Sequence, residues 1–157
     1  CSSDLKDKAE PIKGLPLVFL LRDYKGKDSN DNSIVTYMQT DQLKALFMGD
    51  AGTEAEAALL QRYDLAVDVL KVGHHGSDTS SSLSFLHELQ PQLALVSAGR
   101  NNRYHHPSTA IMQRLRQENI PALVSARDGA VSIRFSRYFS YYVSAEGAIG
   151  ILHGLWE

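Results

Sequence analysis

The feature that most constrains the fold of this chain is a regular alternation of short apolar runs and helical segments across residues 68–125. The apolar runs are bounded by glycine, proline or polar clusters, whereas the segments between them place apolar residues on one helical face. Strands that alternate with helices in this way usually lie parallel in one sheet, which predicts an α/β fold. The expected strands are 68–72, 93–97 and 122–125, and the expected helices are 82–89 and 108–118.

Further strands flank this unit on both sides. After the Asp128-Gly129 turn, "AVSIRF" and "YFSYYVS" predict a closing antiparallel hairpin. A helix should begin near Thr53, because Thr53 and Glu56 have capping-box spacing. The sequence therefore predicts a mixed sheet in an α/β (α+β) fold, and its upstream strands are expected at 15–21, 33–40 and 43–48.

Length and composition fit one domain. A chain of 157 residues that is 43% hydrophobic is long and apolar enough to bury a core. We expect residues 1–14 to be a flexible lead-in or a fragment boundary, residues 15–145 to form the domain, and residues 146–157 to be a tail. No apolar run approaches the roughly 20 residues that span a bilayer.

The charge balance argues against a generally cationic surface. Sixteen Lys and Arg residues oppose eighteen Asp and Glu residues, so a polyanionic substrate would need a local positive site such as a metal. Cys1 is the single cysteine, which excludes an intrachain disulfide and a cysteine-based zinc cluster.

Three polar clusters follow apolar runs directly. They are "FMGDAG" with Asp50, "KVGHHGSDTSSS" with His74 and His75, and "SAGRNNRYHHPS". In open α/β sheets ligands bind at the carboxyl ends of the strands, so we expect the three clusters to meet at one sheet edge.

The first two clusters have the composition of a metal site. A carboxylate and neutral imidazoles suit Zn, Mn or Fe, and flanking glycines allow close approach to the backbone. Asp50 alone is explained as well by a turn before a helix N-terminus. Two adjacent histidines between glycines are harder to explain by packing, so a ligand role is favoured there. The third cluster is either a phosphate-binding loop or a solvated turn.

The clusters lie within four longer blocks: "LFMGDAGTEAEAALL", "VDVLKVGHHGSDTSSSLSFL", "SAGRNNRYHHPSTAIMQRL" and "IPALVSARDGAVSIRF". Together and in this order, over residues 30–135, they resemble the C-terminal half of the metallo-β-lactamase-fold domain of ComEC-family DNA internalisation proteins. The resemblance implies half of an αββα sandwich, with a site for two divalent ions, Zn or Mn, at one edge. It implies DNA uptake during competence (transformation) and a metal-dependent nuclease or phosphodiesterase activity.

Site residues follow from the resemblance. Asp50 matches the carboxylate that bridges the two ions, and His74 is the preferred terminal metal ligand, with His75 as second choice. These three residues are the catalytic candidates. The candidates for substrate binding are Ser77, Arg100, Asn101, Asn102, Arg103 and His106.

The fold's main metal motif, His-x-His-x-Asp-His, does not occur in the 157 residues. We therefore expect a fragment that is inactive alone and can lack a bound metal, and whose partners are DNA and the rest of its parent polypeptide. Loss of the other half of the sandwich should bare an apolar sheet face and favour homo-oligomers. The resemblance implies an inner-membrane parent with this domain on its outer side.

Two alternatives remain open. One is a hydrolase of small esters, thioesters or lactones on the same fold. The other is a metal-free binding or assembly module, which would bind DNA or a partner regardless of chelator.

Overall fold

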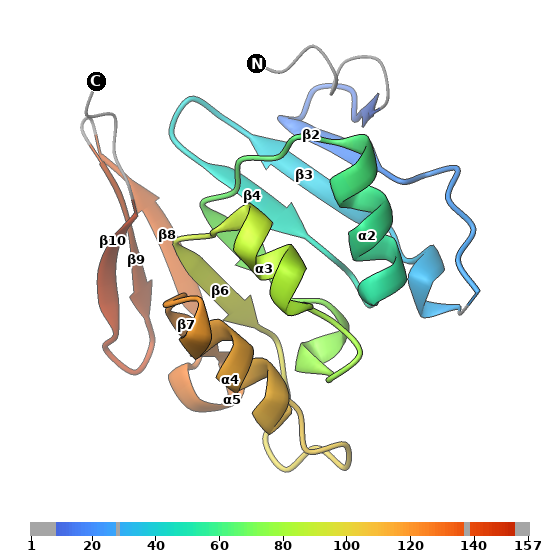
Figure 1. Ribbon diagram of the computed structural model, residues 1–157. Helices are drawn as coiled ribbons and strands as arrows, with labels where there is room; N and C mark the ends of the chain where they lie inside the picture. The colour runs from blue at the N-terminus through green and yellow to red at the C-terminus, as the bar shows by residue number, and fades with distance from the viewer. Residues whose placement is uncertain (1–8, 28, 137–138, 153–157) are drawn as a thin grey trace.

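A seven-stranded mixed sheet forms the centre of the protein in the computed structural model, which describes residues 9–27, 29–136 and 139–152 (Figure 1). The strands follow chain order across the sheet. The first four pair with one another antiparallel, and the fourth strand and the three after it pair parallel. They are β1 (Glu10–Pro11), β2 (Leu17–Leu20), β3 (Val35–Gln39), β4 (Lys44–Phe47), β5 (Val69–Lys71), β6 (Leu93–Val96) and β7 (Ala122–Val124).

Three helices cover one face of this sheet, side by side (Figure 1). They are α2 (Thr53–Arg62), α3 (Leu83–Leu89) and α4 (Thr109–Gln117), and each connects two neighbouring parallel strands. Leu59, Phe85 and Ile111 of these helices are fully buried in one cluster with Leu46 and Leu70 of the sheet. Helices on a parallel sheet bury its strands deeply, which explains why these strands are continuous apolar runs.

The opposite face of the sheet is covered by a second, three-stranded antiparallel sheet. It consists of β8 (Val131–Phe135), β9 (Ser140–Ser144) and β10 (Ile149–Leu152), with β9 in the middle. Val69 and Leu93 of the large sheet are buried in one cluster with Leu152 of β10. We expected the isolated chain to leave this face of the sheet exposed. That expectation is wrong for the centre of the face, which the second sheet covers.

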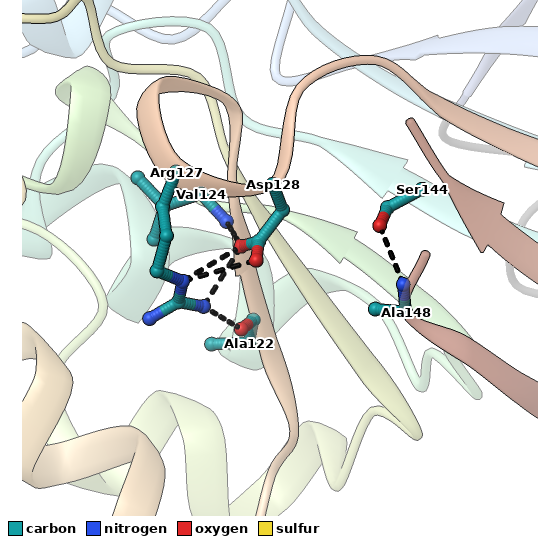
Figure 2. A network of polar contacts seen from close by, with 6 residues as sticks. All are labelled: Ala122, Val124, Arg127, Asp128, Ser144 and Ala148. Atoms are coloured by element: carbon teal, nitrogen blue, oxygen red, sulfur yellow. Dashed lines mark hydrogen bonds and ion pairs between the residues drawn. The ribbon is translucent and has the colours of Figure 1, made fainter. Parts of the chain in front are cut away.

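The link from β7 to the second sheet is a short polar turn, α5 (Ser125–Asp128). Figure 2 shows that the Asp128 carboxylate accepts a 2.7 Å hydrogen bond from the Val124 amide and pairs with Arg127 at 2.8 Å. Arg127 also donates to the carbonyl of Ala122. These bonds fix the direction in which the chain leaves the large sheet. In the same view, the Ala148 amide donates to the Ser144 hydroxyl and tightens the turn before β10.

Most predicted elements are confirmed, with shifts of one or two residues at their ends. The differences lie at the two ends of the domain. Glu10 and Pro11, in the expected lead-in, pair with β2, and the expected tail supplies β10. Residues 1–8 and 153–157 of these two segments lie outside the described residues.

The predicted capping box at the start of α2 is not formed. Gly52 is the N-cap of α2 and no side chain caps it, whereas Glu56 turns inward and is 1% exposed. Within the described part of the chain, no helix is both long and apolar enough to cross a membrane.

There are also η1 (Asn30–Asn32) before β3 and η2 (His74–Gly76) after β5, two short 3-10 turns. Both lie beside the polar clusters described next.

Candidate functional site

Asp50 lies in the tight turn between β4 and α2. Gly49 before it has a φ of 59°, and a Cβ there would come within 3.1 Å of the Ser33 Cβ, so both the turn and the close approach require glycine. The Ser33 hydroxyl accepts a 3.1 Å hydrogen bond from the Asp50 amide. The turn therefore fixes the Asp50 backbone, while its carboxylate stays half-exposed.

His75 faces Asp50 from the loop after β5. Its Nε2 lies 3.6 Å from Asp50 Oδ1, and its Nδ1 lies 2.8 Å from the carbonyl oxygen of Ser97. A carbonyl only accepts, so Nδ1 carries the proton and, in the neutral ring, Nε2 presents a lone pair to a carboxylate. Two acceptors that face each other in this way favour a cation between them. A second nitrogen held by a backbone carbonyl is the usual arrangement of metal-ligating histidines.

His74 points to a different neighbourhood. Its ring lies edge-on to that of His106, with 6.0 Å between centroids. It also lines a cavity of about 360 Å³ together with Asp31, Ser77 and Thr79. The structure thus separates the two histidines and gives the Asp50 contact to His75, the second choice of the sequence-based prediction.

The three polar clusters meet at one edge of the sheet, as predicted. The His74 amide donates to the carbonyl of Gly49, at 3.0 Å, and joins the second loop to the first. A Cβ at Gly73 would come within 2.5 Å of the Ala51 carbonyl oxygen, which shows how closely these loops pack. The third loop joins them through a 2.8 Å bond from the Ser108 amide to the carbonyl of Gly76.

Asn102 holds the third loop together. Its Nδ2 donates to the carbonyls of Gly99 (2.9 Å) and His106 (2.7 Å), and its Oδ1 accepts from the His106 amide (2.8 Å). Both amide protons are used, so Asn102 has no donor left for a phosphate. Its side chain shapes the loop, and its role in substrate binding stays a prediction.

The side chains of the other candidates in this loop differ in how far contacts within the protein fix them. Arg100 Nε donates to the Ala126 carbonyl at 2.9 Å, which fixes that guanidinium against α5. Asn101 is exposed, and its φ of 55° places it at the tip of the turn. Arg103 lies with its guanidinium carbon 4.6 Å from the centroid of the Tyr104 ring.

Ser77, the remaining candidate, is buried. Its hydroxyl lies 3.1 Å from that of Thr79 and accepts from the Thr79 amide. It therefore shapes the turn beside the His74 cavity.

His106 is partly buried next to the histidine pair. Burial lowers the pKa of His106, the nearby His74 and His75 lower it further, and Asp78 acts in the opposite direction. Among the described residues, its Nδ1 is buried without a hydrogen-bond partner. A neutral ring with its proton on Nε2 suits this environment, because a buried, unpaired N–H would cost more.

Lys71 and Glu56 are two features of the site that the sequence did not reveal. Lys71 Nζ lies 3.3 Å from the Gly49 carbonyl oxygen; burial lowers its pKa, and the charge of Asp50 raises it in part. Glu56 accepts hydrogen bonds from the amides of Ser81 and Ser82, and so braces the loop that carries the histidines. Lys71 was overlooked because it lies within the apolar strand sequence "DVLKV". Glu56 was overlooked because its spacing from Thr53 indicated a capping box.

Arg114 of α4 completes this brace from the other side. It donates to the carbonyls of Asp78, Ser80 and Ser81, at 3.2, 2.9 and 3.4 Å. The loop after η2 is thus held by the buried carboxyl group of Glu56 and by the guanidinium of Arg114, which lie on different helices.

The donor set fits one edge of a metal site, and only one edge. Asp50 and His75 have suitable chemistry and face each other, but in the described ranges no group of three or more His, Cys, Asp and Glu residues is placed to hold an ion. A structural or catalytic zinc site needs at least three protein ligands.

The fold is that of an α/β protein with a mixed sheet, whose parallel strands end in loops that bring a carboxylate and an imidazole face to face. No family model matches the chain. Curated relatives do match it, and all four are 31–38% identical to it. They include ComE operon protein 3 of Bacillus subtilis (38% identical over 107 residues), competence protein ComA of Neisseria gonorrhoeae (36% over 115) and recombination protein 2 of Haemophilus influenzae (33% over 106).

These matches cover 68%, 72% and 68% of this chain, respectively. The chain belongs to the ComEC family of competence proteins. It spans only 13–17% of the length of these three relatives.

Proposed function

We propose that this chain supplies one edge of the active site of a metal-dependent DNA hydrolase within a DNA-uptake protein. The observation that carries the proposal is the 3.6 Å approach of His75 Nε2 to Asp50 Oδ1, with the imidazole oriented by the Ser97 carbonyl. Membership in a family of competence proteins supports DNA as the substrate.

The layering supports the corresponding fold. Helices lie on one face of the large sheet and a second sheet lies on the other, an order of layers compatible with part of a metallo-β-lactamase-like αββα sandwich. In that fold the site lies at one edge of the sandwich; here Asp50 and His75 lie in the loops after β4 and β5.

Each residue of the edge has a role in this proposal. When bound, divalent cations such as Zn or Mn lower the pKa of water and offset the charge of the phosphodiester. Asp50 and His75 would hold them on this side, and His75 replaces His74 as the terminal ligand. The charge of Lys71 interacts with that of Asp50 and offsets part of the negative charge of the edge when no metal is bound. The remaining ligands would come from outside the residues described.

The metal ligands can be tested by NMR on the 157-residue chain. Titration with Zn should shift the imidazole nitrogens of His75 and the carboxyl carbon of Asp50 at millimolar metal or below. His75→Ala and Asp50→Ala should each abolish the remaining shift at the other residue, whereas His74→Ala should preserve it. A His75 resonance that does not respond to Zn would contradict the proposed site.

A nuclease assay tests the second part of the proposal. With two donors at the edge, the isolated chain should leave labelled DNA intact in Zn or Mn. Chelator-sensitive cleavage by the chain alone would overturn the claim that the site is incomplete. Turnover of a panel of thioesters and lactones without any action on DNA would favour the small-ester hydrolase. DNA affinity unchanged by chelator and by Asp50→Ala, together with no response of His75 to Zn, would favour a binding module.

A further inference from the structure

Tyr104 is a large aromatic side chain on a polar loop, and it is 62% exposed. Aromatic side chains bury most of their area when they stabilise a fold, so this ring at the edge of the site offers exposed aromatic surface on which a ligand can stack. The residues on either side, Arg103 and His105, are also exposed, so this turn presents its side chains to solvent.

The ring of Tyr104 already takes part in a stack. It lies nearly parallel to the ring of His106, at an interplanar angle of 17° and a centroid distance of 5.8 Å. The backbone of His106 is in turn fixed by two hydrogen bonds with the Asn102 side chain. The loop therefore holds Tyr104 against a backed ring, which reduces the entropy that a stacking partner must overcome.

A cation accompanies the stack. The Arg103 guanidinium carbon lies over the Tyr104 ring, 4.6 Å from its centroid, and the guanidinium donates to the Tyr104 hydroxyl. This guanidinium is exposed and retains further N–H donors. An aromatic face with an adjacent arginine matches a nucleobase and its neighbouring phosphate, which proteins bind by stacking and by charge-assisted hydrogen bonds.

The stack is continuous with the candidate metal edge. His106 lies 6.0 Å from His74, centroid to centroid, and His75, next in sequence, faces Asp50. A strand that rests one base on Tyr104 would thus run toward the Asp50–His75 pair along a row of imidazoles.

We propose that Tyr104 is a stacking platform for a nucleobase of single-stranded DNA, with Arg103 as the contact to the adjacent phosphate. The inference rests on the proposed function for its choice of DNA. A single strand fits because an unpaired base has a free face, whereas bases inside a duplex are covered on both faces by their neighbours. Stacking is tolerant of base identity, so the subsite selects for strandedness rather than for sequence.

The test is fluorescence anisotropy of the 157-residue chain with a short labelled oligo-dT, in EDTA and low salt. Tyr104→Ala should weaken binding roughly ten-fold, within the range for loss of one stacked base, and Tyr104→Trp should retain it. Phe135→Ala is the matched control, since Phe135 is an exposed aromatic on β8 (48% exposed), outside these loops. It should leave the affinity unchanged.

The oligonucleotide provides the second half of a double-mutant cycle. Scanning one abasic position along the strand should find a site whose loss weakens binding by the wild type but not by Tyr104→Ala. A blunt duplex should bind equally to both proteins. No measurable binding of oligo-dT, or an equal loss with Phe135→Ala, would overturn the inference. Circular dichroism and thermal melting should show that Tyr104→Ala is folded.

This assay separates the inference from the proposed function. It is performed in EDTA, so its outcome does not depend on metal binding at Asp50 and His75. If Zn binds at His75 but Tyr104→Ala does not change the affinity for oligo-dT, the stacking proposal is wrong and the proposed metal edge is retained. If Tyr104→Ala weakens oligo-dT binding but Zn does not bind, the stacking proposal is supported and the hydrolase proposal is wrong.

Discussion

Asp50 Oδ1 and His75 Nε2 face each other at 3.6 Å across two loops that follow adjacent parallel strands. The Ser97 carbonyl, at the end of the next strand, sets the orientation of the imidazole. Three successive strands therefore cooperate to point one lone pair at one carboxylate. Such an arrangement has no benefit for packing, because both side chains are about half-exposed. The proposed cation site would account for it.

The charge of Asp50 should be visible at Lys71. Burial lowers the pKa of Lys71 and the Asp50 carboxylate raises it in part, so Asp50→Asn should lower the Lys71 pKa further. NMR titration of the Lys71 side-chain Cε resonance measures this. Asp41→Asn, an exposed change in the turn between β3 and β4, is the control and should have no effect. An unchanged Lys71 pKa in Asp50→Asn would show that the two groups are not coupled.

Glu56→Gln should destabilise the protein by about 1–3 kcal/mol near pH 4.5, because the amide has only one acceptor oxygen for the Ser81 and Ser82 amides. Urea denaturation provides the measurement. Glu54→Gln, at an exposed position of the same helix, should have little effect. Equal stability of Glu56→Gln and the wild type would mean that the brace contributes nothing net.

The effect of Glu56 should also depend on pH. Burial raises its pKa above the ordinary value of 4.5, although the hydrogen bonds from Ser82 and Ser81 oppose the shift. A raised pKa in the folded state means that the folded protein binds this proton more tightly. The contribution of Glu56 to stability is then greatest below about pH 4.5 and declines as the pH rises to the folded pKa. Gln does not titrate, so the stability difference between wild type and Glu56→Gln should narrow as the pH rises through that window.

Close loop packing should make Gly73 irreplaceable. An alanine Cβ there would lie 2.5 Å from the Ala51 carbonyl oxygen, and a backbone atom cannot swing away. We expect Gly73→Ala to cost at least about 1–3 kcal/mol, as for overpacked cores, measured by chemical denaturation. Gly99→Ala is a matched control, because nothing lies within 4 Å of its added Cβ. If both variants melted alike, the three loops would not pack as described.

Asn102→Ala should loosen the third loop without unfolding the domain. The substitution removes three hydrogen bonds, including the one that the His106 amide donates. Amide hydrogen exchange at His106 should therefore accelerate, while exchange at Leu70, in the centre of the sheet, should not. Full protection of the His106 amide in the variant would show that the clamp is dispensable.

The elements that local patterns specify were predictable. Ser82 and Ser108 cap α3 and α4 through bonds to the amides three residues on, as their positions before apolar helical runs indicate. The role of Glu56 was not predictable from sequence. Its carboxylate accepts hydrogen bonds from two amides of a loop distant in sequence, and not from the N-terminus of its own helix. β10 was missed since the glycines in "GAIGIL" weaken its strand pattern, although Gly150 is needed to admit the Tyr142 ring.

The choice between the two histidines also lies beyond the sequence. His74 and His75 both have a positive φ, 45° and 55°, so the turn sends neighbouring rings in different directions. Which ring meets Asp50 depends on the Ser97 carbonyl, which comes from another strand. Local sequence contains no signal for that contact.

Self-association, expected from the sequence, should now be sought at β10. This strand lies at an edge of the smaller sheet, and its Ile149 and Ile151 are 69% and 73% exposed. Exposed apolar edge strands tend to pair with another chain, and a charge there opposes pairing. Ile149→Lys and Ile151→Lys should each shift the protein toward monomer in sedimentation velocity at high concentration. Leu15→Lys, a change at an exposed aliphatic residue outside β10, should not. A wild type that stays monomeric would instead show that the covered sheet needs no second copy.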